Sequence, residues 1–150
     1  MDTTALRSAY AGFISEARQG GFGPPPDGEW SADQVVAHVA ANDELLAATT
    51  LRVLDGDGHP YYNHDAIDTE RLDTLISVHP DVVQWLEETS AALCDLADRL
   101  PDSDRTLVHT QIVDGTITRL DRPVPWPMVL QTQAEMHLPR HLEQLRALRP

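Results

Sequence analysis

The chain has 150 residues and a formal net charge of −13, and all 11 of its basic residues are arginines. So acidic a chain lacks the basic footprint of a general nucleic-acid binder or of a polybasic membrane-surface protein. Its single cysteine excludes an internal disulfide, and the lack of lysine excludes Schiff-base catalysis. Seven histidines beside that cysteine indicate that any metal site is built from imidazole rather than thiolate.

The length is that of one ordinary domain, so residues 1–150 are predicted to form a single domain. No stretch approaches the roughly 20 apolar residues that a membrane helix requires. The N-terminus lacks the basic region and apolar core of a signal peptide. We therefore expect a cytoplasmic protein with no membrane partner and no nucleic-acid partner.

Helical periodicity begins close to the N-terminus. Residues 2–19 are predicted to form a first helix, because apolar residues recur there at spacings of three and four. A second helix is predicted from the capping box of Ser31 and Gln34 to about Leu54, where an Asp-Gly-Asp-Gly run ends it.

Less regular segments follow the second helix. Residues 55–66 are predicted to be a long polar loop, and residues 67–78 a short helix or the first part of a longer one. The His79-Pro80 pair marks a boundary or kink, because a residue before proline avoids the helical region. Apolar residues at helical spacing then predict a helix over 81–100.

After residue 105 apolar and polar residues alternate, which is the period of a β-strand rather than of a helix. Asp114-Gly115 between two alternating runs predicts a tight hairpin. Residues 122–127 are predicted to be a rigid proline-rich connector, and a last helix is expected from about Trp126 to Leu148. Together, the predicted helices and hairpin indicate an all-α fold, a four-helix bundle with a small β-hairpin before the last helix.

Three histidines on predicted helices are candidate metal ligands. His137 and His141 lie four residues apart, so both imidazoles project from one helix face. Such pairs also occur on solvated surfaces. His38 lies within the second helix among small and apolar residues, where a core histidine is the alternative. If the two helices face one another, three imidazoles with open positions suit a catalytic metal.

Two segments carry a family resemblance. Trp30–Ala40 (WSADQVVAHVA) resembles the W-(S/T)-x-x-(D/E)-x-(V/L)-x-H-(L/V) opening of helix two in the DinB-like superfamily. Met136–Leu145 (MHLPRHLEQL) resembles its final-helix H-x-x-x-H-x-x-Q-L signature. That superfamily includes YfiT-like metal-dependent hydrolases and the metal-binding domain of mycothiol-dependent maleylpyruvate isomerases.

The resemblance implies a four-helix bundle that holds one divalent metal ion, with His38, His137 and His141 in the three ligand positions. Zinc or nickel is the expected ion. One residue departs from the pattern: Pro139 lies between two of the histidines, removes a backbone hydrogen bond to residue 135 and predicts a kink there.

Three further residues are candidates for the surroundings of the site. Asp43 follows His38 by five residues and is a possible outer partner of a ligand, with a solvated helix face as the alternative. Asn63 and His64 belong to the polar loop after the second helix. That loop can fold over the open side of a metal site and meet a substrate, or it can simply be exposed.

Two functional hypotheses follow. The first is a metal-dependent enzyme that activates water or a low-molecular-weight thiol, giving a hydrolase or a thiol-dependent transferase or isomerase for a small molecule. Mycothiol is the thiol that the resemblance implies. The second is a non-catalytic bundle that binds a metal or ligand in a stress response or with a partner. Relatives of this kind often pair through helices, so a homodimer is expected.

Overall fold

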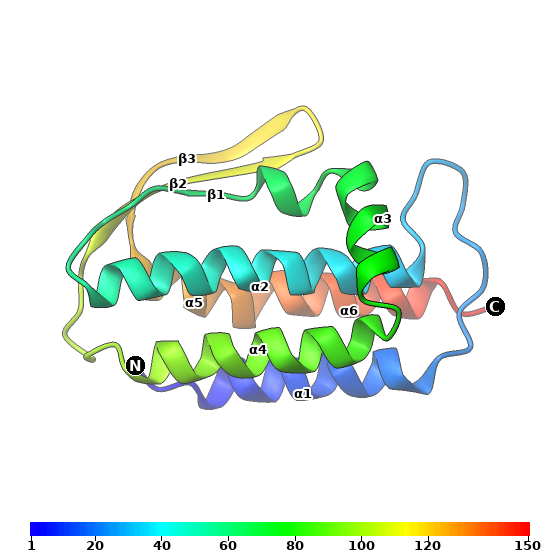
Figure 1. Ribbon diagram of the computed structural model, residues 1–150, viewed down its shortest axis with the longest axis horizontal. Coiled ribbons are helices and arrows are strands. Elements are labelled where there is room, and N and C mark those ends of the chain that lie inside the picture. Colours follow the sequence, from blue (N-terminus) through cyan, green and yellow to red (C-terminus); the bar gives the residue numbers. More distant parts are fainter.

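Long helices lie side by side along the molecule, and a small sheet covers part of this helical layer (Figure 1). The computed structural model describes all 150 residues. The helical elements are α1 (Thr4–Gln19), α2 (Ala32–Leu54), the 3₁₀ turn η1 (His64–Ala66), α3 (Thr69–Val78), α4 (Val82–Asp98), α5 (Trp126–Thr132), the π-helical segment η2 (Gln133–His137) and α6 (Leu138–Ala147). The strands are β1 (Tyr61–Tyr62), β2 (Leu107–Asp114) and β3 (Ile117–Pro125).

The helix α2 is the central element, since it contacts α3, α4, α6, η1 and β1. Its N-terminus has the predicted capping box, in which the Ser31 hydroxyl accepts from the Gln34 N–H at 3.2 Å and the Gln34 side chain accepts from the Ser31 N–H at 2.9 Å. One face of the helix is buried in the core, with Val35, Val39, Asn42, Leu46 and Thr49 at helical spacing. No helix of the chain is both long enough and apolar enough to span a membrane.

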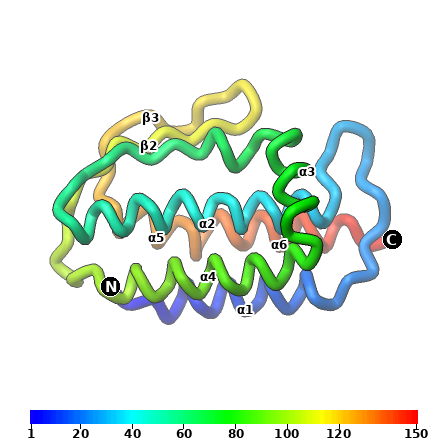
Figure 2. Tube along the Cα trace, viewed as in Figure 1, coloured from blue at the N-terminus to red at the C-terminus, as the bar shows by residue number.

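The C-terminal helix is continuous through α5, η2 and α6 (Figure 2). In its middle, over η2, the hydrogen-bonded turn is one residue longer than in an α-helix. In η2 the N–H of Leu138 reaches back five residues to the carbonyl of Gln133. Pro139 follows directly and has no N–H to donate. The π turn therefore lies where the proline disrupts regular helical bonding, and the predicted kink takes the form of this local widening.

The sheet has the order β1-β2-β3, with β1 parallel to β2 and β2 antiparallel to β3. The predicted hairpin is present: β2 ends at Asp114, and Gly115, at φ 61°, begins the two-residue turn to Ile117. Asn63 connects this hairpin to the segment before α3. Its side-chain amide donates to the carbonyl of Val113 and accepts from the N–H of Val113, both at 2.9 Å.

The expectation of an all-α four-helix bundle with a hairpin is wrong, because the fold is mixed α/β with a three-stranded sheet. The segment 55–66, predicted to be a loop, contains β1 and η1, which are too short to show a period. Of the proline-rich segment 122–127 predicted to be a connector, Trp126 and Pro127 begin α5, and residues 122–125 are the end of β3. Its prolines are tolerated because β3 is an edge strand, where missing donors face away from the ladder.

We expect Asn63→Ala to lower the free energy of unfolding by about 1–3 kcal/mol, because it leaves both backbone groups of Val113 without a partner. Urea unfolding measures the change. The matched control is Gln111→Ala, which removes only exposed side-chain contacts to His64 and Asp121 and should stay within about 0.5 kcal/mol. Equal stabilities of the two variants would contradict the role of Asn63.

Candidate metal centre

Three histidines from distant parts of the chain converge at one point. His38 comes from α2, His137 ends η2, and His141 lies one turn later in α6. The Nε2 atom of His137 is 3.1 Å from the Nε2 of His38 and 3.1 Å from the Nε2 of His141. One ligand atom from each histidine lies within 4.8 Å of the other two. The widening of the helix before Pro139 does not separate His137 from His141.

In two of the rings, the hydrogen bond made by Nδ1 determines which ring nitrogen carries the proton. The Nδ1 of His38 is 2.7 Å from the backbone carbonyl oxygen of Ala66, which can only accept a hydrogen bond. In a neutral ring that Nδ1 must carry the proton, so Nε2 has a free lone pair. The Nδ1 of His141 is likewise 2.7 Å from the side-chain oxygen of Gln144. Two Nε2 lone pairs therefore point toward the same place.

The third ring, that of His137, cannot donate a hydrogen bond to both of the other rings. The Nε2 of His137 contacts two lone-pair nitrogens, and a neutral ring can donate from it to only one of them. The Nδ1 of His137 is buried and has no hydrogen-bond partner. A bound cation removes the conflict, because all three Nε2 atoms can then act as electron-pair donors. The residues present thus fit a divalent metal ion with three imidazole ligands.

Burial keeps the three rings neutral. It lowers the pKa of His38 to about 3, with the neighbouring His141 as the next contribution. Burial also holds the pKa of His137 well below its ordinary value. It lowers the pKa of His141 as well, although the hydrogen bond that His141 donates to Gln144 acts in the opposite direction. Neutral imidazole is the form that binds a metal ion, so the site is ready to bind at neutral pH.

Other side chains complete the walls around His38. The indole of Trp30 lies beside it, with 5.0 Å between the ring centroids, and the indole N–H donates to Thr69 at 3.3 Å. Ala66 ends the 3₁₀ turn η1 and is fully buried. The ring of His38 is thus held between an aromatic side chain and a backbone carbonyl, and its Nε2 can face only toward the cluster.

Asp43 lies in the core and has its polar partners away from the three histidines. It accepts hydrogen bonds from the hydroxyls of Tyr10 and Thr89. Tyr10 in turn accepts from Gln133 at 3.1 Å. Burial raises the pKa of Asp43 well above its ordinary value. This network joins α1, α2 and α4 to the first residue of η2, and so Asp43 supports the segment that carries His137 rather than contacting a ring of the cluster.

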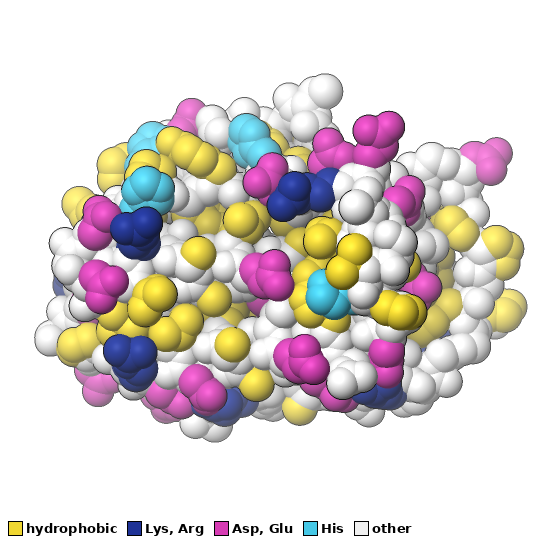
Figure 3. All heavy atoms as spheres, in the orientation of Figure 1, with side chains coloured by type: hydrophobic (Ala, Val, Ile, Leu, Met, Phe, Trp, Pro, Cys, Tyr) yellow, Lys and Arg dark blue, Asp and Glu magenta, His cyan; other side chains and the backbone are white.

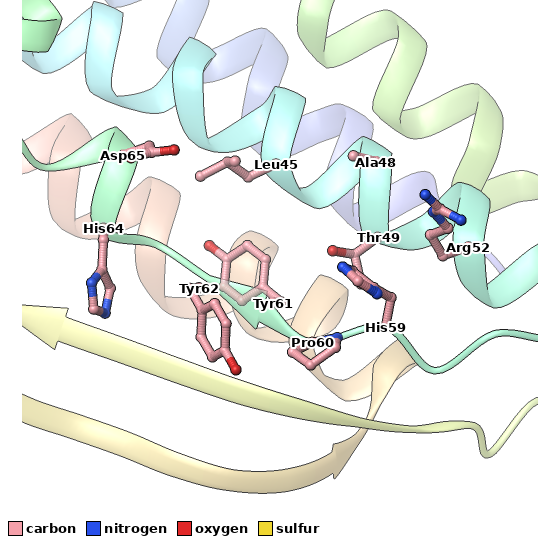
Figure 4. Close-up of a pocket in the computed structure, with 10 residues that line it drawn as sticks. All are labelled: Leu45, Ala48, Thr49, Arg52, His59, Pro60, Tyr61, Tyr62, His64 and Asp65. Atoms are coloured by element: carbon pink, nitrogen blue, oxygen red, sulfur yellow. The ribbon is translucent and has the colours of Figure 1, made fainter.

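Asn63 and His64 border the sheet rather than the histidine cluster. Asn63 is bonded to Val113, and His64 lines a pocket of about 450 Å³ between α2 and β1 (Figure 4). Arg52 and His59 lie at one end of this pocket, and His64 and Asp65 lie at the other. None of the three clustered histidines lines it. The pocket is connected to the cluster only through η1, whose last residue, Ala66, accepts a hydrogen bond from His38 through its carbonyl.

Two residues that position the ligands were not predicted from the sequence. Gln144 lies inside the segment that carries the family resemblance, at its Q position, so a signal for its role was present. The carbonyl of Ala66 leaves no trace in the side-chain pattern, because a backbone acceptor can be supplied by any residue type.

Three neutral histidines that converge from α2 and the C-terminal helix define the chain as a candidate metal-binding protein of mixed α/β fold. No family model and no curated protein matches the chain in sequence. Among solved structures the chain is similar to the crystal structure of the mycothiol-dependent maleylpyruvate isomerase, with a TM-score of 0.67 and 18% sequence identity. The match covers 97% of this chain and 58% of that chain. At this identity the likeness shows a shared fold, and the chain spans little more than half of the isomerase.

We expect the metal-free protein to lose stability as the pH falls below about 6.5, where a histidine of the unfolded chain begins to bind a proton. Folded His38 stays neutral down to a pKa of about 3. Between these two pH values the unfolded state binds more protons than the folded state, so the free energy of unfolding rises with pH. Urea unfolding with a chelator present measures the slope.

His38→Asn is the variant for this test, because its amide keeps a donor near the carbonyl of Ala66 but does not titrate. Its stability should depend less steeply on pH than that of the original chain across the same window. Parallel slopes for the two proteins would show that His38 is not held neutral by the fold.

Proposed function

We propose that this chain is a divalent-metal-dependent enzyme of the DinB-like superfamily that acts on a small molecule by hydrolysis or thiol transfer. His38, His137 and His141 would hold the ion. The observation that carries the proposal is the convergence of three Nε2 atoms, two of which have outer nitrogens that already donate to oxygen acceptors. Three nitrogen donors suit zinc or nickel.

A divalent ion at this position supplies Lewis acidity, which lowers the pKa of water or of a thiol toward neutrality. The chain's own residues perform the other tasks. The carbonyl of Ala66 holds the proton of His38 on Nδ1, and the side-chain oxygen of Gln144 does the same for His141. These contacts orient both rings before any ligand arrives, which reduces the reorganisation that binding requires.

The candidate ligand set consists of three imidazole rings and contains no carboxylate. A neutral ligand set of this kind leaves the full positive charge of the ion available to a substrate or thiol. The similarity of fold to a mycothiol-dependent isomerase supports the thiol route over simple hydrolysis. A low-molecular-weight thiol is therefore the second cofactor of the proposal, and a homodimer in the cytoplasm is its proposed setting.

We expect the chain to bind one zinc or nickel ion, and His137→Ala to weaken binding by more than about 100-fold, since loss of an orienting partner alone costs about 10–100-fold. Gln144→Leu should fall in that smaller range, because it removes the acceptor for His141 but no ligand. Isothermal titration with each metal measures the affinities. The matched control, His64→Ala, removes an imidazole from the neighbouring pocket and should bind normally. Equal affinities in all four proteins would disprove the assignment of the ligands.

The enzymatic part of the proposal needs a separate test. The zinc- or nickel-loaded protein should consume an electrophile such as 1-chloro-2,4-dinitrobenzene in the presence of a thiol, or cleave a p-nitrophenyl ester, and should lose this turnover on chelation. His137→Ala controls for contaminating activity. A protein that binds metal but turns over neither class of compound would favour the alternative, a non-catalytic metal-binding protein.

A further inference from the structure

A group of opposite charges lies where the hairpin meets the C-terminal helix. Asp114, the last residue of β2, places its Oδ2 atom 3.3 Å from a guanidinium nitrogen of Arg140 in α6. The same Oδ2 is 3.3 Å from a guanidinium nitrogen of Arg119 in β3. Two cations therefore share one oxygen of one carboxylate, and this small group has a net charge of +1.

This charged group lies beside the candidate metal centre. Arg140 follows His137 by three residues and precedes His141 by one, and residues three apart on a helix are neighbours on its surface. Its positive charge contributes to the lowered pKa of all three clustered histidines. Of the three histidines, only His137 is not fully buried, and it is the one that lies three residues before Arg140.

The hairpin end that carries Asp114 is held in place from the other side. The amide of Asn63 makes two hydrogen bonds to Val113, the residue before Asp114. Asn63 also directly precedes η1, which ends at the carbonyl that bonds His38. The position of Asp114 opposite Arg140 is therefore built into the same set of contacts that orients His38.

The ion pairs themselves are exposed and exchangeable. The side chain of Arg140 is 70% exposed and that of Arg119 is 57% exposed. Exposed pairs of this kind contribute little to stability, because water and salt screen them. An external anion can therefore replace Asp114 at small cost. Acidic side chains are spread over the face shown in Figure 3, and in a chain of net charge −13 an excess of positive charge beside the histidines is a local exception.

We propose that Arg140 is a specificity-determining residue that binds the carboxylate of a small anionic ligand at the three-histidine centre, with Asp114 as the internal anion that the ligand displaces. The guanidinium already donates to a carboxylate in this place, and its planar array of donors matches that group. The inference rests on the proposed function, because the remainder of the ligand would reach the metal ion. It identifies the substrate class as small carboxylic acids.

The test uses the zinc-loaded chain and succinate, a dicarboxylate that chelates zinc weakly. Isothermal titration should show that Arg140→Gln weakens succinate binding by about tenfold or more. Asp114→Asn should strengthen it severalfold, because the internal competitor is removed. Arg146→Gln is the matched control: it makes the same change of charge on the same helix, where the arginine pairs with Glu16, and should leave the affinity within about twofold. Succinamide, which is uncharged, should not bind.

Zinc content is measured in every variant before the titration. A wild-type chain that binds neither zinc nor nickel overturns the proposed function itself. A zinc-loaded chain in which Arg140→Gln and Arg146→Gln have the same effect overturns only the role of Arg140, because general charge would then explain the binding. Weaker succinate binding in Asp114→Asn would likewise contradict the displacement of Asp114.

Discussion

Two outward hydrogen bonds determine what the centre of this protein can do. The Nδ1 atoms of His38 and His141 face oxygen acceptors, so their Nε2 lone pairs face inward, and both meet the Nε2 of His137 at the centre. Lone pairs that converge in this way repel one another, so the arrangement is unfavourable without a cation. Burial prevents protonation of the rings from removing this repulsion. A cation is the natural complement, and the nearby elements of the fold can be understood as supports for this arrangement.

Those supports reach the three rings from different elements. The capping box at Ser31 begins α2 about two turns before His38, and η1 places a carbonyl against that ring. The C-terminal helix is anchored through Gln133, whose amide bonds Tyr10 and thereby the buried Asp43. The sheet extends the same frame toward the surface. Its hairpin brings Asp114 to Arg140, beside two of the proposed ligands, and so connects the site to its charged surroundings.

Periodicity and capping were sufficient to predict α1, α2 and the hairpin, and helical spacing was sufficient to pair His137 with His141. The mixed sheet was not predictable in this way, because β1 has two residues and Pro123 and Pro125 concealed the end of β3. The partners of Asp43 lie in α1 and α4, far away in sequence, so no local pattern could place it in the core. Long-range contacts and backbone acceptors therefore account for what the sequence alone left undetermined.

The most direct test of the central claim is anomalous diffraction at the zinc and nickel absorption edges from crystals of the metal-loaded protein. We expect one strong peak among His38, His137 and His141, at about 2.0–2.1 Å from each Nε2 when the ion is zinc. A peak at any other group of side chains, or no peak among these histidines in a chain that carries metal, would contradict it.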